Sequence, residues 1–146
     1  MIHEYPVIGE INLAQGEDGS MMGTPGAGMK ITVEYFGQGY GRSSPVRFLL
    51  NHAKCDFEYI GYDFPTWGKI KGEGKGGEFG GLPRVTINGQ EFGQSMASLR
   101  MLGTKLGYYD PTDWKAAFYC DVVLDAWVDV LGSTTGIMLS GAAPEE

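Results

Sequence analysis

The stretch LPRVTINGQEFGQSMASLRMLGTKLG, residues 82–107, carries the strongest fold signals in the chain. Two short runs within it, 84–87 and 90–92, contain β-branched and aromatic residues and are separated only by Asn88-Gly89. Both residues of this dipeptide readily adopt the positive φ angles of a two-residue primed turn. The pattern therefore predicts a β-hairpin.

A helix is expected directly after this hairpin. Ser95 stands where a hydroxyl can cap the first turn, and apolar residues recur with helical spacing from Met96 to Leu106. Gly107 is typical of a helix end. Residues 82–107 are therefore predicted to form a strand–strand–helix unit.

Upstream of the hairpin, the pattern predicts a strand–helix–strand unit. The β-branched and aromatic run 30–36 and the alternating run 57–62 are predicted strands. Between them, Pro45 suits the first helical position, and apolar residues in 46–53 follow at i, i+3, i+4 and i+7. Such a unit implies parallel strands joined by a right-handed crossover.

Together these units predict an α/β fold with the thioredoxin-like order β-α-β, then β-β-α. The connection between the two halves, residues 63–81, is predicted to be a long glycine-rich loop. Loops of this length are uncommon in compact domains and are often functional.

The remaining segments suggest three regions. Glycine is frequent and aperiodic in 16–29, so residues 1–29 are predicted to be a flexible extension. Residues 30–107 form the predicted thioredoxin-like domain. Residues 108–146 are predicted to begin an all-α domain that is truncated.

One helix is predicted in this last region. Thr112 or Asp113 can cap it, and Gly132 is expected to end it. The residues that share one face are Trp114, Ala117, Phe118, Asp121, Leu124 and Val128.

Composition excludes several classes of function. The formal net charge is −7, which argues against nucleic acid and against anionic lipid, because both need clustered Lys and Arg. No apolar run approaches the roughly 20 residues of a membrane span, so no membrane insertion is expected. The first residues have neither the basic nor the apolar region of a secretory signal.

Cysteine and histidine usage points to a reducing compartment without a metal site. Cys55 and Cys120 are not a CxxC pair, and the two histidines show no metal-ligand spacing. We therefore expect free thiols, no metal and a cytoplasmic location, with an organelle left open. The missing CxxC also disfavours a dithiol oxidoreductase.

Four short motifs occur in order on the predicted elements. An aromatic pair ends the first strand, Trp and Lys stand four apart in the long connection, Leu-Pro precedes the third strand, and Gln-Ser opens the following helix. These motifs are Tyr35-Phe36, Trp67 with Lys71, Leu82-Pro83 and Gln94-Ser95. With them, residues 30–131 resemble the N-terminal domain and first C-terminal-domain helix of cytosolic glutathione transferases of the tyrosine type (sigma, mu and pi).

The resemblance implies that Tyr35 activates the thiol of glutathione. A phenol that donates a hydrogen bond to sulfur favours the thiolate, which is the nucleophile. Ser43 and Ser44 lie where serine-type transferases keep their activating hydroxyl, and Tyr40 lies in the intervening loop. They are alternatives to Tyr35, whose Tyr-Phe context matches the tyrosine type.

The resemblance also implies a set of glutathione ligands. Gln94 and Ser95 would bind the γ-glutamyl carboxylate, since a helix N-terminus favours anions. Trp67 and Lys71 supply donors for the glycyl carboxylate. Leu82 and a cis Pro83 would present backbone groups to the cysteinyl residue, in the manner of an added strand.

Two further ligands follow from the resemblance. Arg42 falls near the family's Arg-Gly-Arg loop, although the loop here is one residue longer. Asp121 falls where family members present an acidic residue to the γ-glutamyl amine bound by the neighbouring subunit; the spacing of Asp121, Asp125 and Asp129 equally fits a solvated acidic stripe.

The implied function is detoxification: transfer of glutathione to small electrophiles, with glutathione as co-substrate. Members of the family continue for several more helices, so this chain alone should leave apolar surface exposed. A homodimer partner or another chain is expected to cover that surface. The open alternative is a non-catalytic, transferase-like structural subunit docked in a larger assembly.

Overall fold

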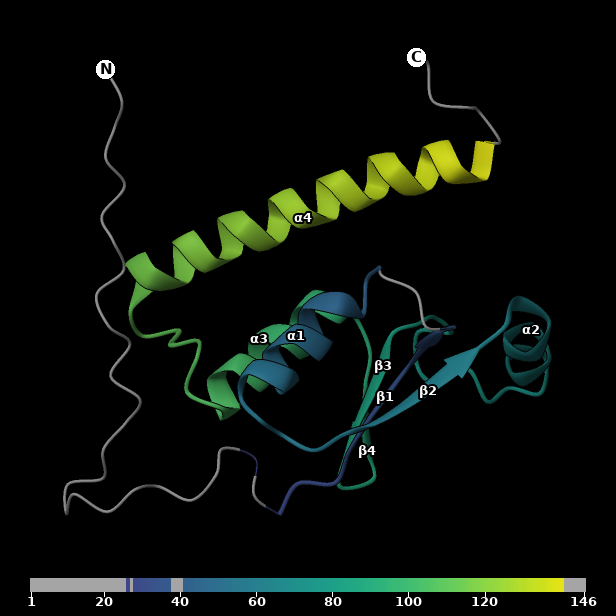
Figure 1. Cartoon of the computed structure of the whole chain (residues 1–146), viewed down its shortest axis with the longest axis horizontal. Helices are drawn as coiled ribbons and strands as arrows, with labels where there is room; N and C mark the ends of the chain where they lie inside the picture. The colour runs from purple at the N-terminus through teal and green to yellow at the C-terminus, as the bar shows by residue number, and fades with distance from the viewer. Residues whose placement is uncertain (1–25, 27, 38–40, 141–146) are drawn as a thin grey trace.

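The structure, a computed structural model, describes residues 26, 28–37 and 41–140, with side chains through residue 135 (Figure 1). The predicted extension therefore lies almost entirely outside the described residues, as does Tyr40. The end of that extension is in contact with the domain, because Met29 packs against the core. The division into three regions stays a prediction.

A four-stranded sheet with the order β2-β1-β3-β4 organises the fold. β1 and β2 are parallel, whereas β3 is antiparallel to both β1 and β4. The predicted hairpin turn is confirmed, with φ angles of 51° at Asn88 and 84° at Gly89. The strands are β1 Ile31–Phe36, β2 Glu58–Tyr62, β3 Arg84–Ile87 and β4 Gln90–Phe92.

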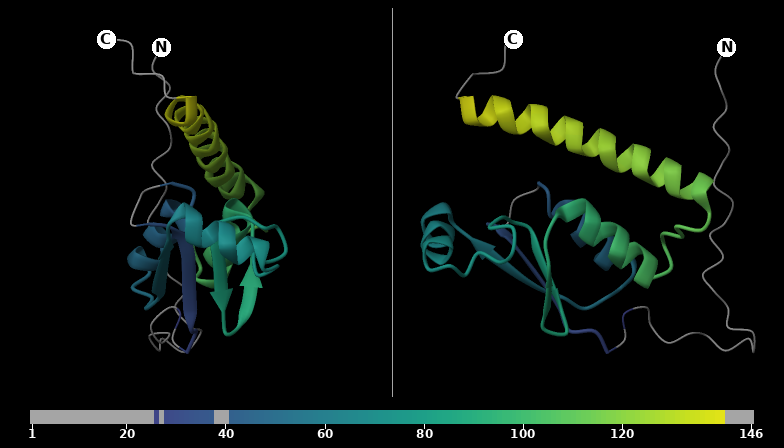
Figure 2. Two further views of the ribbon diagram at one scale, coloured as in Figure 1. Left: turned by 90° about the vertical axis from the view of Figure 1, so that its right-hand side faces the viewer. Right: turned by 180° about the vertical axis from the view of Figure 1, so that it is seen from behind.

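The helices confirm the predicted α/β fold, a thioredoxin-like domain followed by one long helix. α1 and α3 pack together beside the sheet, α2 lies beyond the end of β2, and α4 extends past α1 and α3 (Figures 1 and 2). The helices are α1 Ser44–His52, α2 Phe64–Gly72, α3 Ser95–Lys105 and α4 Trp114–Ser140.

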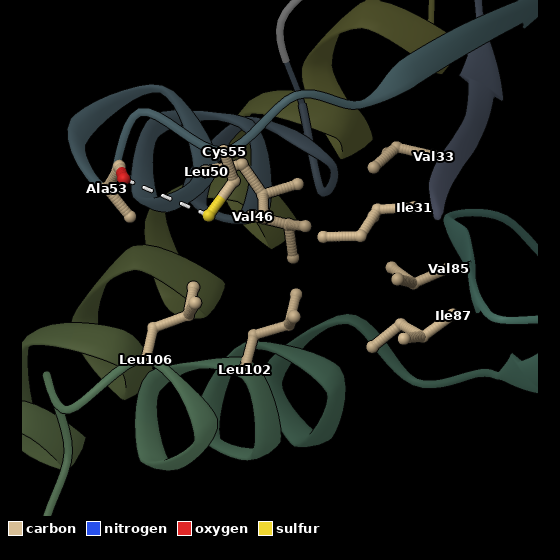
Figure 3. Packing of buried hydrophobic residues seen from close by; sticks show 10 residues of the cluster. All are labelled: Ile31, Val33, Val46, Leu50, Ala53, Cys55, Val85, Ile87, Leu102 and Leu106. Atoms are coloured by element: carbon tan, nitrogen blue, oxygen red, sulfur yellow. Dashed lines mark hydrogen bonds between the residues drawn. The ribbon is translucent and has the colours of Figure 1, made fainter. Parts of the chain in front are cut away.

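The core lies between the sheet and the helix pair α1 and α3. Alternate residues of β1 and β3 point toward the helices, and their partners come from the inner faces of α1 and α3 (Figure 3). Burial of each large aliphatic side chain contributes about 1.5–3 kcal/mol. The cluster comprises Ile31, Val33, Val46, Leu50, Ala53, Cys55, Val85, Ile87, Leu102 and Leu106.

The predicted loop over 63–81 is wrong in its first half, which forms helix α2. The Asp63 carboxylate caps this helix by accepting the backbone N–H of Thr66 at 2.7 Å, and Pro65 lies in its first turn. Trp67 is buried and anchors the helix. Only the remainder, from Glu73 to Pro83, connects α2 to β3 without regular structure.

The predicted start of α3 also needs correction. Ser95 is the first helical residue rather than the cap, and Gln94 occupies the N-cap position without a side-chain capping bond. The φ and ψ angles of Gln94 are 62° and 95°, a backbone conformation that residues other than glycine seldom adopt. Such outliers often mark functional positions.

For α4, the start is as predicted and the end is not. Asp113 accepts the backbone N–H of Ala116 at 3.1 Å, so Asp113 provides the cap. Gly132 does not end the helix, which continues to Ser140. A single glycine costs about 1 kcal/mol relative to alanine, which a 27-residue helix tolerates.

α4 exposes much of its apolar surface, as expected for a partial helical domain. Trp114 and Phe118, which were predicted to share one face, are 77% and 59% exposed, and Val123 and Val130 are also exposed. Within the described ranges, no helix combines the length and the apolarity needed to cross a membrane.

Candidate glutathione-site edge

The sheet topology brings most of the predicted ligand positions to one edge. β1 and β2 are parallel and therefore end at the same edge. The pairing of Glu34 with Arg84 places the start of β3 beside the end of β1, and the pairing of Val85 with Phe92 places the end of β4 there too. We call this the site edge: the ends of β1, β2 and β4, and the start of β3.

Tyr35 lies at the site edge, on the face of β1 that it shares with Val33. Its side chain is half-buried, and its hydroxyl oxygen accepts the backbone N–H of Arg42 at 3.1 Å. Because the oxygen serves as acceptor in that bond, the phenolic proton is available for another acceptor. The Arg42 side chain itself is exposed.

Gly41 permits this close approach. A Cβ atom at this position would lie 2.6 Å from the Tyr35 hydroxyl oxygen and 3.1 Å from its ring. Real Cβ contacts essentially never fall that short, so a side chain here would force the loop or the phenol to move. The glycine thus allows the loop backbone to pack directly on Tyr35.

The two alternative serine hydroxyls are less accessible than Tyr35. Ser44 is buried, and its hydroxyl accepts the Gly41 N–H at 2.9 Å. Ser43 is fully buried, and its hydroxyl has no hydrogen-bond partner among the described residues. A ligand would need the start of α1 to move before it could reach either group.

Leu82-Pro83 and Gln94-Ser95 approach the site edge from the second half of the domain. The Leu82-Pro83 peptide bond is cis. Pro83 is buried and Leu82 is half-buried. The Gln94 side chain is exposed next to the first turn of α3, whereas Ser95 is only 8% exposed. This turn offers backbone N–H groups and the positive end of the helix dipole.

Trp67 and Lys71 lie one turn apart on α2, which follows β2 at the site edge. The Trp67 ring packs against Tyr62, with ring centroids 5.7 Å apart. Lys71 is exposed, and its stem runs along the following segment, since a Cβ on Gly76 would lie 3.2 Å from Lys71 Cγ. Lys71 is thus exposed, whereas Trp67 is buried.

Asp121 lies on α4, and its hydrogen-bond partners are side chains of this chain rather than the predicted γ-glutamyl amine. Its carboxylate accepts Arg100 Nε at 2.6 Å and the Tyr109 hydroxyl at 3.3 Å. The hydrogen bond to Asp121 raises the pKa of Arg100. In the isolated chain, Asp121 therefore joins α4 to α3.

An ion pair that the sequence did not reveal lies beside the predicted ligands. Arg84 Nη2 donates to the Glu34 carboxylate at 2.7 Å, and the Tyr62 hydroxyl donates to it at 2.6 Å. Burial raises the pKa of Glu34, but the Arg84 and Tyr62 hydrogen bonds outweigh it and leave that pKa below its usual value. Burial and the bond to Glu34 raise the pKa of Tyr62.

No group of three or more potential metal ligands occurs in the described part of the chain. The absence of a metal stays a prediction. Neither Cys55 nor Cys120 forms a disulfide bond. Burial, and to a smaller extent the charge of Asp56, raises the pKa of Cys55.

No family model matches this sequence. Glutathione S-transferase 4 of Caenorhabditis elegans is 29% identical over 89 residues, which cover 61% of this chain and 41% of the relative. Among solved structures, a Nu-class GST from Haemonchus contortus is 28% identical with a TM-score of 0.61 over 71% of this chain and 48% of its own. NaGST-2 is 26% identical, with a TM-score of 0.65 over 81% and 56%.

These similarities confirm the resemblance predicted from the four motifs. The chain matches glutathione transferases in sequence and in fold. It spans about half the length of these solved structures and less than half of the curated relative.

Proposed function

Because this chain shares the sequence pattern and fold of the N-terminal half of glutathione transferases, we propose that it binds glutathione at the site edge and transfers the thiolate to small electrophiles. The observation that carries the proposal is the convergence there of Tyr35, the cis Leu82-Pro83 turn and the Gln94-Ser95 start of α3. These positions come from three separate segments.

Tyr35 acts on the sulfur in this proposal. The Arg42 N–H occupies an acceptor site of the phenol oxygen, so the phenolic proton points away from that bond and toward a bound thiolate. A hydrogen bond to the charged form lowers the pKa of the thiol. The thiolate then attacks the electrophilic carbon, a C–S bond forms, and the displaced group leaves with its electron pair.

The glutathione backbone is held by the other ligands. The first turn of α3, with Gln94 and Ser95, binds the γ-glutamyl carboxylate. The backbone N–H and C=O of Leu82 pair with the cysteinyl residue, since neither makes a hydrogen bond with the described part of the chain. Lys71, Trp67 and Arg42 complete the set, with Lys71 and Trp67 at the glycyl carboxylate.

A homodimer is the proposed assembly, and the exposed apolar residues of α4 support a partner that covers them. Asp121 would reach the γ-glutamyl amine of the neighbouring subunit only by sharing its carboxylate with Arg100. Cys55 and Cys120 form no disulfide bond, which fits the proposed cytoplasmic compartment.

Alanine at Gln94 or Ser95 should weaken glutathione binding about tenfold, because each removes a donor to a charged carboxylate. Isothermal titration calorimetry at near-neutral pH measures this change. Gln90→Ala is the matched control, since Gln90 is exposed at the opposite edge of the sheet. Equal losses in all three variants would argue against the α3 site, and a folded parent that binds no glutathione would favour the structural subunit instead.

Gly41→Ala should lower kcat about tenfold at saturating glutathione, because the added Cβ displaces the loop from the Tyr35 hydroxyl. Steady-state kinetics with a chlorodinitrobenzene, which loses chloride as the thioether forms, measures the effect. Gly132→Ala is the control, since a Cβ there meets no atom within 4 Å. Unchanged kcat in Gly41→Ala would show that the loop–phenol contact is dispensable.

A further inference from the structure

Arg84 joins the segment between α2 and β3 to the strands of the domain. Arg84 Nη1 donates to the backbone carbonyl of Lys75 at 3.1 Å. A Cβ on Gly77 would lie 3.4 Å from Arg84 Cδ and 3.2 Å from the Glu91 carboxylate, so the segment folds over the guanidinium. Lys71 lies just before this segment and Leu82 lies within its end.

Arg84 is itself held rigidly from the other side. Its Nε and Nη2 both bind the Glu34 carboxylate, which is 5% exposed in the middle of β1. Tyr62 donates to the same carboxylate and packs against Trp67 of α2. Arg84 of β3, Glu34 of β1 and Tyr62 of β2 thus link three strands. Through Trp67 and the Lys75 carbonyl, they also contact α2 and the segment that follows it.

We propose that Arg84 is a positioning residue for glutathione binding. It fixes the segment 73–82 and thereby holds Lys71 and Leu82 where they can bind glutathione at the site edge. The inference rests on the proposed function. Arg84 contacts neither the sulfur nor the electrophile. It acts by holding a segment in which three glycines, Gly74, Gly77 and Gly80, have positive φ angles. Because glycine loses more conformational freedom on ordering than other residues, this segment needs an anchor.

The clamp requires arginine because two directions must be served at once. The planar guanidinium presents a fork to Glu34 while its remaining N–H group reaches the Lys75 carbonyl. A lysine ammonium at position 84 can keep the charge pair with Glu34, but it is a single point of contact. Arg84→Lys is therefore expected to keep the ion pair with Glu34 and to lose the hydrogen bond to the Lys75 carbonyl that holds the segment.

The test compares the unchanged chain with Arg84→Lys. We expect the KM for glutathione, with a chlorodinitrobenzene as electrophile, to rise roughly tenfold in the variant, and kcat to stay within about twofold. Hydrogen exchange should become faster at the amides of 73–81 and stay unchanged in β1 and α1. Glu73→Gln is the control, because it breaks the exposed ion pair with Lys75 on the same segment.

A purely structural role predicts another result. Loss of folded protein lowers the apparent kcat and leaves the KM for glutathione unchanged, and that outcome in Arg84→Lys would overturn the inference. Unaltered exchange in 73–81 would overturn it as well. If the unchanged chain binds no glutathione, the proposed function fails and the inference fails with it, which is seen in the parent before any variant is measured.

Discussion

Replacing Tyr35 with phenylalanine should lower kcat about a hundredfold and change glutathione affinity by less than about threefold. The phenylalanine keeps the ring, which packs edge-on against Phe36 with centroids 5.5 Å apart. It removes only the hydroxyl that receives the Arg42 N–H and that would donate to sulfur. Binding depends on the carboxylate and backbone ligands, so the effect falls on the chemical step.

Two measurements check this expectation. Steady-state kinetics gives kcat, and the pH dependence of the rate gives the pKa of the bound thiol, which should rise toward the ordinary thiol value in Tyr35→Phe. Tyr119→Phe is the matched control, because it removes an exposed hydroxyl on α4. If turnover survives in Tyr35→Phe, another group activates the thiol, and the hydroxyls of Ser43, Ser44 and Tyr40 become the next candidates.

The elements of the domain and their order along the chain were predictable because their signals are local. Asn88-Gly89 determines the hairpin, and the apolar faces of 30–36 and 46–53 specify a strand and a helix without reference to the rest of the chain. Once the order is known, topology alone brings the ends of β1 and β4 to the start of β3. Much of the candidate site could therefore be predicted from the sequence.

The errors have local physical causes. α2 was missed because glycine and lysine are frequent in 63–81, although Asp63 followed by Pro65 is a helix-start signal. The predicted end of α4 at Gly132 is wrong because a single glycine does not end a helix by itself, and α4 continues through Gly132 to Ser140. The backbone of Gln94 was unpredictable, since no sequence rule assigns it a positive φ angle.

The Glu34–Arg84 pair illustrates a different limit. Its partners are 50 residues apart, and only the antiparallel register of β1 and β3 makes them neighbours. A lone glutamate within an apolar strand is nevertheless a signal, because a buried carboxylate requires a cation or several donors. Searching for a cation on the adjacent strand would have identified Arg84.

Arg84→Met should destabilise the domain by about 3–5 kcal/mol, the usual cost of leaving one member of a buried ion pair without its partner. Glu34 is 5% exposed, so water cannot replace the lost guanidinium. Chemical denaturation at pH 7 measures the free energy of unfolding. Lys75→Met is the control, since it breaks the exposed pair with Glu73 and should cost less than about 1 kcal/mol.

The pH dependence identifies the buried charge as the cause. In the unchanged chain the pKa of Glu34 lies below its usual value, so its contribution to stability is present above the unfolded pKa and is lost as pH falls through the folded pKa. In Arg84→Met only burial and Tyr62 act on Glu34, so its pKa should rise and its carboxyl group should take up a proton. The gap in stability between the two proteins should therefore narrow as the pH is lowered, whereas a gap that stays constant would point to lost packing.

A double replacement separates the same two causes at constant pH. Glu34→Leu combined with Arg84→Met removes both charges and keeps apolar volume, so it should recover most of the stability that Arg84→Met loses, because an unpaired buried charge costs more than a missing pair. The Tyr62 hydroxyl then loses its acceptor, which keeps the recovery incomplete. If the double variant is instead as unstable as Arg84→Met, the loss comes from the bond between Arg84 and the Lys75 carbonyl. The clamp on the α2–β3 segment would then contribute to folding as well as to ligand positioning.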